Sequence, residues 1–158
     1  MNRKNLSMWL KVMIICVGAC GALIYSLVLP MIADSLEPFA SDTAAKYSWL
    51  CLLWASGAPC YAVLVFSWLV CRDIEKEKAF TAANAKRLKN ISVLAGADTV
   101  FLFLGNAALF LAGKNNLFTM AFCALAAFLG VAFSVAFAAL SHLAERACEL
   151  QEECDLTI

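Results

Sequence analysis

The stretch LFTMAFCALAAFLGVAFSVAFAAL, residues 117–140, contains no charged side chain. It exceeds the ~20 residues that a helix needs to cross a hydrocarbon core of ~30 Å. Three more apolar stretches of comparable length precede it, at residues 8–32, 49–71 and 91–112. Hydrophobic residues make up 63% of the chain, against ~45–50% in soluble domains. We therefore predict a single all-α domain, residues 1–158: a polytopic membrane protein with four transmembrane helices in two antiparallel hairpins.

Lysine and arginine are sorted between the segments that flank these stretches. The first and third loops hold only Lys46 and Lys114. The other basic residues lie near the N-terminus, in the loop 72–90 or in the tail 141–158: Arg3, Lys4, Lys11, Arg72, Lys76, Lys78, Lys86, Arg87, Lys89 and Arg146. Short basic segments stay cytoplasmic, so we predict that both termini and the loop 72–90 are cytoplasmic. The formal net charge is zero, which gives no support to direct nucleic-acid binding.

Proline, glycine and capping residues indicate where the helices begin and end. Pro30 lacks an N–H and disfavours helix at the residue before it, so the first helix is predicted to end near it. Pro59 is predicted to kink the second helix. Thr81 is a candidate N-cap for a short helix that leads into the third span. The outer turn 113–116 is tight, which favours a hairpin of the third and fourth helices.

The fourth helix is predicted to continue beyond the membrane, because no glycine or proline follows Val131. If it is continuous over 117–153, its ~37 residues span about 55 Å, and roughly half of that length projects into the cytoplasm. One face carries an apolar stripe, with acidic residues largely opposite. The stripe consists of Leu143, Ala147, Leu150 and Cys154. We expect it to be covered by the loop 72–90, by another protomer of a homo-oligomer or by a different protein.

Asp98 is the one ionisable residue within an apolar stretch and away from its ends. A charge there costs roughly 2.5–3.5 kcal/mol on insertion scales unless it meets a partner or water. Asn106 lies close to the same helical face. Two interpretations stay open. Asp98 is either a proton or cation site in a polar seam, or a hydrogen-bonded carboxyl, reached by Lys89, Thr99 or water, that fixes helix packing.

Two further patterns concern helix packing. Small residues recur at every fourth position in the fourth helix, at Ala126, Gly130, Ser134 and Ala138, and in the first helix at Gly18 and Ala22. Such ladders let helix backbones approach closely, either within one chain or across a dimer. Aromatic and basic residues cluster where the second helix begins, at Lys46, Tyr47, Trp49 and Trp54. They are predicted to form an interfacial belt.

Residues that carry catalysis or hold metals are sparse. Six of the eight cysteines, Cys16, Cys20, Cys51, Cys60, Cys71 and Cys123, lie in or beside apolar stretches, and Cys148 and Cys154 lie in the tail. This distribution favours helix packing over disulfides. His142 is the only histidine, and a metal site needs three or four convergent ligands. No phosphate-binding loop, nucleophile elbow or zinc-protease signature occurs. We expect no metal, no cofactor and no enzymatic activity.

Two predicted cytoplasmic segments resemble a named family. FTAANAKRLKNI at residues 80–91 is similar to that family's F-T-x-x-N-x-x-R-L-K-x-I stretch before the third helix. ELQEECDLTI at residues 149–158 is similar to its E-L-x-E-E-x-D-L-T-I ending. The family comprises bacterial membrane proteins catalogued as domain of unknown function 2975. Together with the four-helix layout, the resemblance covers nearly the whole chain.

The resemblance implies a bacterial cytoplasmic-membrane protein that binds a soluble partner. Members of the family look like partners of a small helix-turn-helix DNA-binding regulator often encoded beside them, so this chain is expected to hold or antagonise such a regulator at the membrane. The expected partner-binding residues are Phe80, Asn84, Arg87, Leu88, Leu150, Glu153, Asp155, Leu156, Thr157 and Ile158. The alternative is a small oligomeric transporter or channel subunit that uses Asp98 as its ion- or proton-coupling residue.

Overall fold

The computed structural model describes residues 3–35, 42–75 and 81–155, and the side chains of 8–35, 42–75 and 81–150. Its elements are α1 (Arg3–Leu23), the π-helical turn η1 (Ile24–Val28), α2 (Leu29–Ser35), α3 (Thr43–Glu75), α4 (Ala82–Leu111) and α5 (Leu117–Asp155). Four helical segments are long and apolar enough to cross a membrane: Met8–Ser35, Thr43–Glu75, Ala82–Leu111 and Leu117–Leu150. The prediction of an all-helical protein with four such helices is confirmed.

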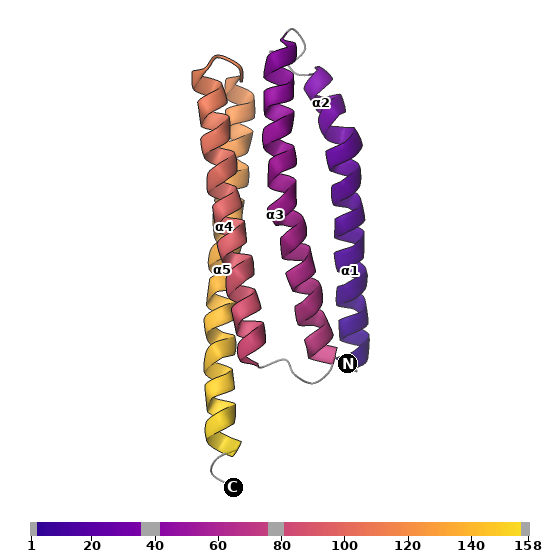
Figure 1. Ribbon diagram of the computed structural model, residues 1–158, viewed down its shortest axis with the longest axis vertical. Coiled ribbons are helices and arrows are strands. Elements are labelled where there is room, and N and C mark those ends of the chain that lie inside the picture. Colours follow the sequence, from indigo (N-terminus) through magenta and orange to yellow (C-terminus); the bar gives the residue numbers. More distant parts are fainter. Residues whose placement is uncertain (1–2, 36–41, 76–80, 156–158) are drawn as a thin grey trace.

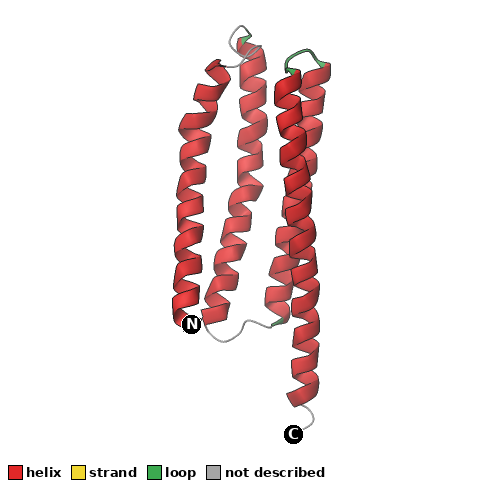
Figure 2. Cartoon of the chain, turned by 180° about the vertical axis from the view of Figure 1, so that it is seen from behind, coloured by secondary structure: helices red, strands yellow, loops and turns green. Residues whose placement is uncertain are grey.

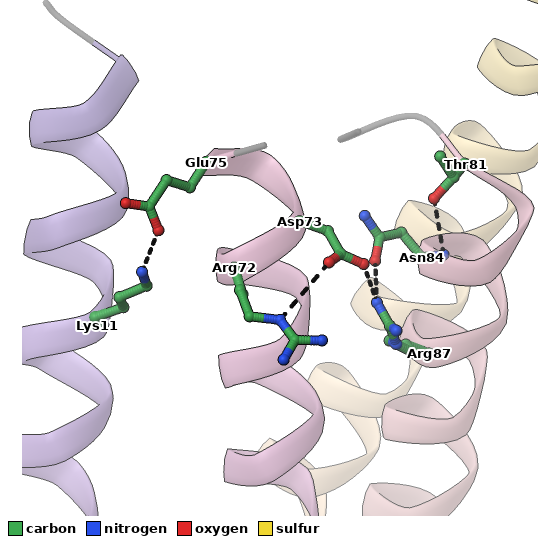
Figure 3. A network of polar contacts seen from close by, with 7 residues as sticks. All are labelled: Lys11, Arg72, Asp73, Glu75, Thr81, Asn84 and Arg87. Atoms are coloured by element: carbon green, nitrogen blue, oxygen red, sulfur yellow. Dashed lines mark hydrogen bonds and ion pairs between the residues drawn. The ribbon is translucent and has the colours of Figure 1, made fainter. Parts of the chain in front are cut away.

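The helices form an open arc (Figure 1). α1 packs on α3, α3 packs on α4, and α4 packs on α5. No described Cα atom of α1 lies within 8 Å of one in α4 or α5, so the ends of the arc do not meet. The view from behind shows the same order, with α5 reaching well past the other helices at the end where α1 begins (Figure 2). We call that end the basic end, because Lys11, Arg72 and Arg87 lie there (Figure 3).

The first helix does not end near Pro30, which corrects the sequence-based prediction. It continues through η1 and α2 to Ser35. In η1 the hydrogen bonds widen, and the Leu29 N–H donates to the Ile24 carbonyl five residues back. The next bond of this wide ladder would come from Pro30, which has no N–H, to the carbonyl of Tyr25. The indole Nε1 of Trp54 on α3 donates to that carbonyl at 3.2 Å. The carbonyl that Pro30 cannot reach is therefore satisfied from the neighbouring helix.

The third span begins earlier than its apolar stretch does. α4 starts at Ala82 and runs unbroken to Leu111, so the short helix predicted before the membrane is the first part of α4. Thr81 is its N-cap, as predicted: its backbone is extended, and its side chain accepts a hydrogen bond from the Asn84 N–H. α3 extends to Glu75 and is continuous through Pro59. The predicted loop 72–90 is thereby shortened to the residues between Glu75 and Thr81.

α5 runs without interruption to Asp155, which confirms the predicted extension of the fourth helix. Small and hydroxylated residues hold it against α4. Ser92 Oγ donates to the Ser134 carbonyl at 2.8 Å, and Ser134 Oγ donates to the Ser92 carbonyl at 2.9 Å. Gly130 lies against the side chain of Thr99. Two members of the small-residue ladder, Gly130 and Ser134, therefore pack within the chain.

At the other end of the molecule, a small core joins α2 to α3. It contains Ala33, Ala45, Trp49 and Leu50, all buried. Trp49 is therefore not part of an exposed interfacial belt, because it is only 7% exposed. Tyr47 and Trp54 are largely exposed, as a belt requires. Lys46 is ion-paired with Asp34 across the same pair of helices.

Candidate functional site

The basic end of the bundle is fastened by a network of charged and polar side chains (Figure 3). Arg87 on α4 forms an ion pair with Asp73 on α3, and its Nη1 also donates to Asn84 Oδ1 at 2.8 Å. Arg72 Nε lies 4.0 Å from the other carboxyl oxygen of Asp73. Lys11 on α1 is ion-paired with Glu75. The network thus joins α1, α3 and α4 at the ends flanking residues 76–80.

Asn84 and Arg87, two of the residues expected to bind a partner, are used inside the protein. Asn84 is only 1% exposed, and its side chain accepts from Arg87 while its backbone N–H is capped by Thr81. Both residues therefore have a structural role at the joint between α3 and α4. Leu88 on the same helix is half-buried. Phe80 lies outside the described residues.

The end of α5 presents the exposed part of the predicted surface. Ser141 Oγ donates to the Ala85 carbonyl at 2.8 Å, which puts Ser141 level with the first turn of α4. Ser141 and Ala144 are buried on the face toward α4. Leu143 and Leu150, two turns apart, are 65% and 62% exposed on a different face. Glu153 and Asp155 belong to α5, but their side chains are not described, and Leu156, Thr157 and Ile158 lie outside the described residues.

A groove of about 560 Å³ runs between the first turns of α4 and the projecting part of α5. Lys86 and Lys89 line it from α4, and Glu145 and Glu149 line it from α5. The two walls therefore carry opposite charge. This arrangement suits a polar segment that brings charges of both signs, and it lies beside the exposed leucines of α5.

The second polar site lies within the bundle, at Asp98. Ser56 Oγ on α3 donates to Asp98 Oδ2 at 2.9 Å, and Cys60 Sγ, one turn further along α3, lies 3.6 Å from the same oxygen. Asp98 Oδ1 is buried and has no hydrogen-bond partner among the described residues. The predicted approach of Lys89 to Asp98 is not seen, since Lys89 lines the groove at the basic end.

Asn106 does not join Asp98 in one seam. Its side chain donates to the Leu102 carbonyl at 3.0 Å and accepts from Asn115 Nδ2 at 3.3 Å. Asn115 and Asn106 are both buried. Asn116 Oδ1 accepts a hydrogen bond from the Thr119 N–H and so caps the start of α5. Asn106 thus secures the turn between α4 and α5, about 12 Å along α4 from Asp98.

Sequence reasoning did not identify the partners of these residues. Ser56 and Cys60 are spaced by one helical turn on either side of a helix-interior proline, a pattern that marks one polar face of α3. Asp73 follows Arg72 at the end of an apolar span, where a charged pair is unremarkable in sequence. Nothing in the sequence indicates that Asp73 forms its close ion pair with Arg87 on α4 rather than with the adjacent Arg72.

Comparisons with known proteins relate the chain to membrane proteins of unknown function. Residues 31–158 match a family described as "Protein of unknown function (DUF2975)". The chain is 25% identical over 163 residues to the "Uncharacterized membrane protein YoaS" of Bacillus subtilis (strain 168), with full coverage of both chains. No solved structure matches. The match to the family spans most of the chain and includes both motif-bearing segments, so the protein belongs to the DUF2975 family of membrane proteins.

Proposed function

We propose that this chain is a non-enzymatic, multi-pass protein of the bacterial plasma membrane that binds a soluble partner through its basic end and α5. In this proposal the four helices form two antiparallel hairpins with both termini in the cytoplasm. The excess of lysine and arginine at the basic end supports that orientation. The bacterial relative supports the proposed membrane.

The projection of α5 is the observation that carries the proposal. Since Ser141 is level with Ala85 and α4 begins at Ala82, the part of α5 after Ala144 extends roughly 15 Å past the start of α4. Leu143 lies at the base of this projection and Leu150 lies within it, and an isolated helix that exposes them outside the bilayer has unfavourable contact with water. An amphipathic helix of this kind is a common element of protein recognition.

The proposed partner is a small helix-turn-helix regulator. Such proteins carry a basic surface for DNA, and the end of α5 is rich in carboxylates, with Glu145, Glu149, Glu152, Glu153 and Asp155. Opposite charge favours rapid encounter and correct orientation, while the exposed leucines supply the apolar contact. A regulator held in this way at the membrane has its DNA-binding surface occupied.

Binding of a regulator is testable with the full-length chain in nanodiscs. The probe is the purified helix-turn-helix protein encoded beside this chain in its genome. We expect Leu150→Lys and Leu143→Lys each to weaken binding at least about tenfold, because truncating or charging a central apolar anchor removes most of its contribution. Leu117→Lys, at the opposite end of α5 and equally exposed to its surroundings, is the matched control and should bind normally.

Deletion of residues 149–158 provides the decisive variant. The shortened protein should insert and unfold as the full chain does, because the four spans are intact, but should no longer capture the regulator. Unchanged capture by the shortened form, or equal losses in Leu150→Lys and Leu117→Lys, would reject the tail as the binding surface.

The proposed orientation has its own prediction. In a chain whose other cysteines are replaced by serine, Cys154 should resist a membrane-impermeant maleimide applied to intact cells and react fully once the cells are opened. A second chain carrying only Lys114→Cys, in the turn between α4 and α5, should react from outside. Labelling of Cys154 in intact cells would show that the tail lies outside the cell, where a cytoplasmic regulator cannot bind it.

The alternative, a small oligomeric transporter or channel subunit coupled through Asp98, remains a prediction. A polar path through one chain gains little support, because Asp98 and Asn106 belong to separate clusters on α4. The arc of helices is also open between α1 and α5, so an enclosed pathway requires a second protomer.

A further inference from the structure

A pocket on the inner side of the helix arc is lined by Asp98. The pocket has a volume of about 440 Å³, within the ~300–1,000 Å³ range of sites for small molecules. All four long helices contribute to it, through residues such as Gly21, Cys60, Ala95, Asp98, Phe133 and Phe137. Apart from the Asp98, Cys60, Thr99 and tyrosine groups, its walls are apolar.

The Asp98 carboxyl has no oppositely charged partner in the part of the protein that the structure describes. Among the described residues, no lysine, arginine or histidine lines the pocket. Oδ2 accepts from Ser56 and Cys60, whereas Oδ1 has no partner. Ionisable groups within a bilayer pair with an opposite charge or face water. A carboxylate beside an apolar pocket therefore selects for a cation that can also enter an apolar space.

The open side of the arc determines how such a cation would arrive. α1 and α5 both line the pocket, but their described residues do not approach each other. In a bilayer, we expect the side of the pocket between these two helices to face lipid. A ligand that partitions into the bilayer can enter sideways through it, whereas an inorganic cation would first have to lose its water in an apolar environment.

We propose that this pocket binds a lipophilic ammonium compound, with its apolar body against Phe133 and Phe137 and its ammonium group paired with the Asp98 carboxylate. Asp98 Oδ1 is buried as the carboxyl group now lies, but the terminal torsion of a carboxyl group is broad, so the group can turn one oxygen toward the ammonium. Ser56 and Cys60 hold the remaining oxygen. The proposal is independent of the function proposed for α5, since the pocket includes none of the residues that project from the basic end.

The test uses the full chain in phosphatidylcholine nanodiscs and the fluorescent primary amine dansylcadaverine. Its N-acetylated form, which has the same body without the charge, is the matched ligand control. We expect saturable binding of the amine and at least about tenfold weaker binding of the acetylated form. Asp98→Asn, which keeps an acceptor for Ser56, should weaken amine binding by roughly 30-fold or more and leave the acetylated form unaffected.

A second pocket variant guards against effects on folding. Ala95→Leu adds bulk to the pocket wall and leaves Asp98 in place, so it should weaken both ligands. Glu145→Gln, which removes a carboxylate at the basic end, and deletion of residues 149–158 should change neither. Equal affinity of the wild type for the two ligands, equal affinity of Asp98→Asn and wild type for the amine, or a lack of saturable binding would each overturn the proposal. The first two results would indicate a pocket for neutral lipid or a protonated Asp98.

Discussion

Gly130→Val should markedly destabilise the pair of helices α4 and α5. A Cβ atom at Gly130 would overlap Thr99 Oγ1 and lie 3.1 Å from Thr99 Cγ2. Thr99 cannot easily move aside, because its side chain is β-branched and buried and its hydroxyl donates to the Ala95 carbonyl at 2.7 Å. The helices must therefore separate, which weakens the hydrogen bonds between Ser92 and Ser134. Overpacking of this kind costs about 1–3 kcal/mol, and occasionally more.

Thermal unfolding in detergent micelles measures this effect, with two matched glycine controls. A Cβ at Gly18 would have its nearest neighbour, Leu64 Cδ1, at 3.6 Å, which is an ordinary contact, so Gly18→Ala should be tolerated. A Cβ at Gly105 would meet the end of the Leu52 side chain. That side chain is flexible and can rotate away, so Gly105→Ala should also be tolerated. Gly130→Ala alone should lower the unfolding temperature, and adding Thr99→Ala should recover much of that decrease. Failure of that rescue would contradict the described contact.

Arg87→Ala should open the joint between α3 and α4. It leaves the Asp73 carboxyl, whose side chain is only 17% exposed, with the longer contact to Arg72, and it removes the hydrogen bond from Arg87 to Asn84 Oδ1. Removing one member of a well-buried pair costs ~3–5 kcal/mol. Because Arg87 itself is 23% exposed and lies at the end of the bundle, we expect about 1–3 kcal/mol. The loss should appear as a lower unfolding temperature.

Arg72 supplies the control on the same carboxyl group. Its Nε is 4.0 Å from Asp73 Oδ1, and its side chain is 50% exposed, so Arg72→Ala should cost at most about 1 kcal/mol. Arg87→Ala combined with Asp73→Ala should be less destabilising than the two single losses added together, because the carboxylate that loses its Arg87 contact is removed as well. Equal effects of Arg87→Ala and Arg72→Ala would show that the pair does not fasten the joint. Unaltered regulator binding by a folded Arg87→Ala protein would further separate this structural role from partner binding.

The sequence predicted the features that depend on local chemistry. The four spans followed from the length of the apolar stretches, and the continuation of α5 to Asp155 followed from the lack of glycine and proline after Val131. Thr81 was identified as an N-cap from its side chain and from the helix-forming residues after it. The end of the first helix was predicted wrongly, because the compensation for Pro30 comes from Trp54 on a different helix.

The direction in which each side chain faces was decided by the tertiary structure alone. The pairing of Asp98 with Ser56 and Cys60, of Arg87 with Asp73, and the burial of Trp49 each join helices that are distant in sequence. In a soluble protein the apolar face of a helix would have indicated the core. Lipid tails are as apolar as a helix interface, so hydrophobicity alone does not separate the inward from the outward face of these helices. The sequence by itself therefore determined which segments are helical and long enough to span a bilayer, while packing between the helices determined which residues form the joint, the pocket and the exposed surface.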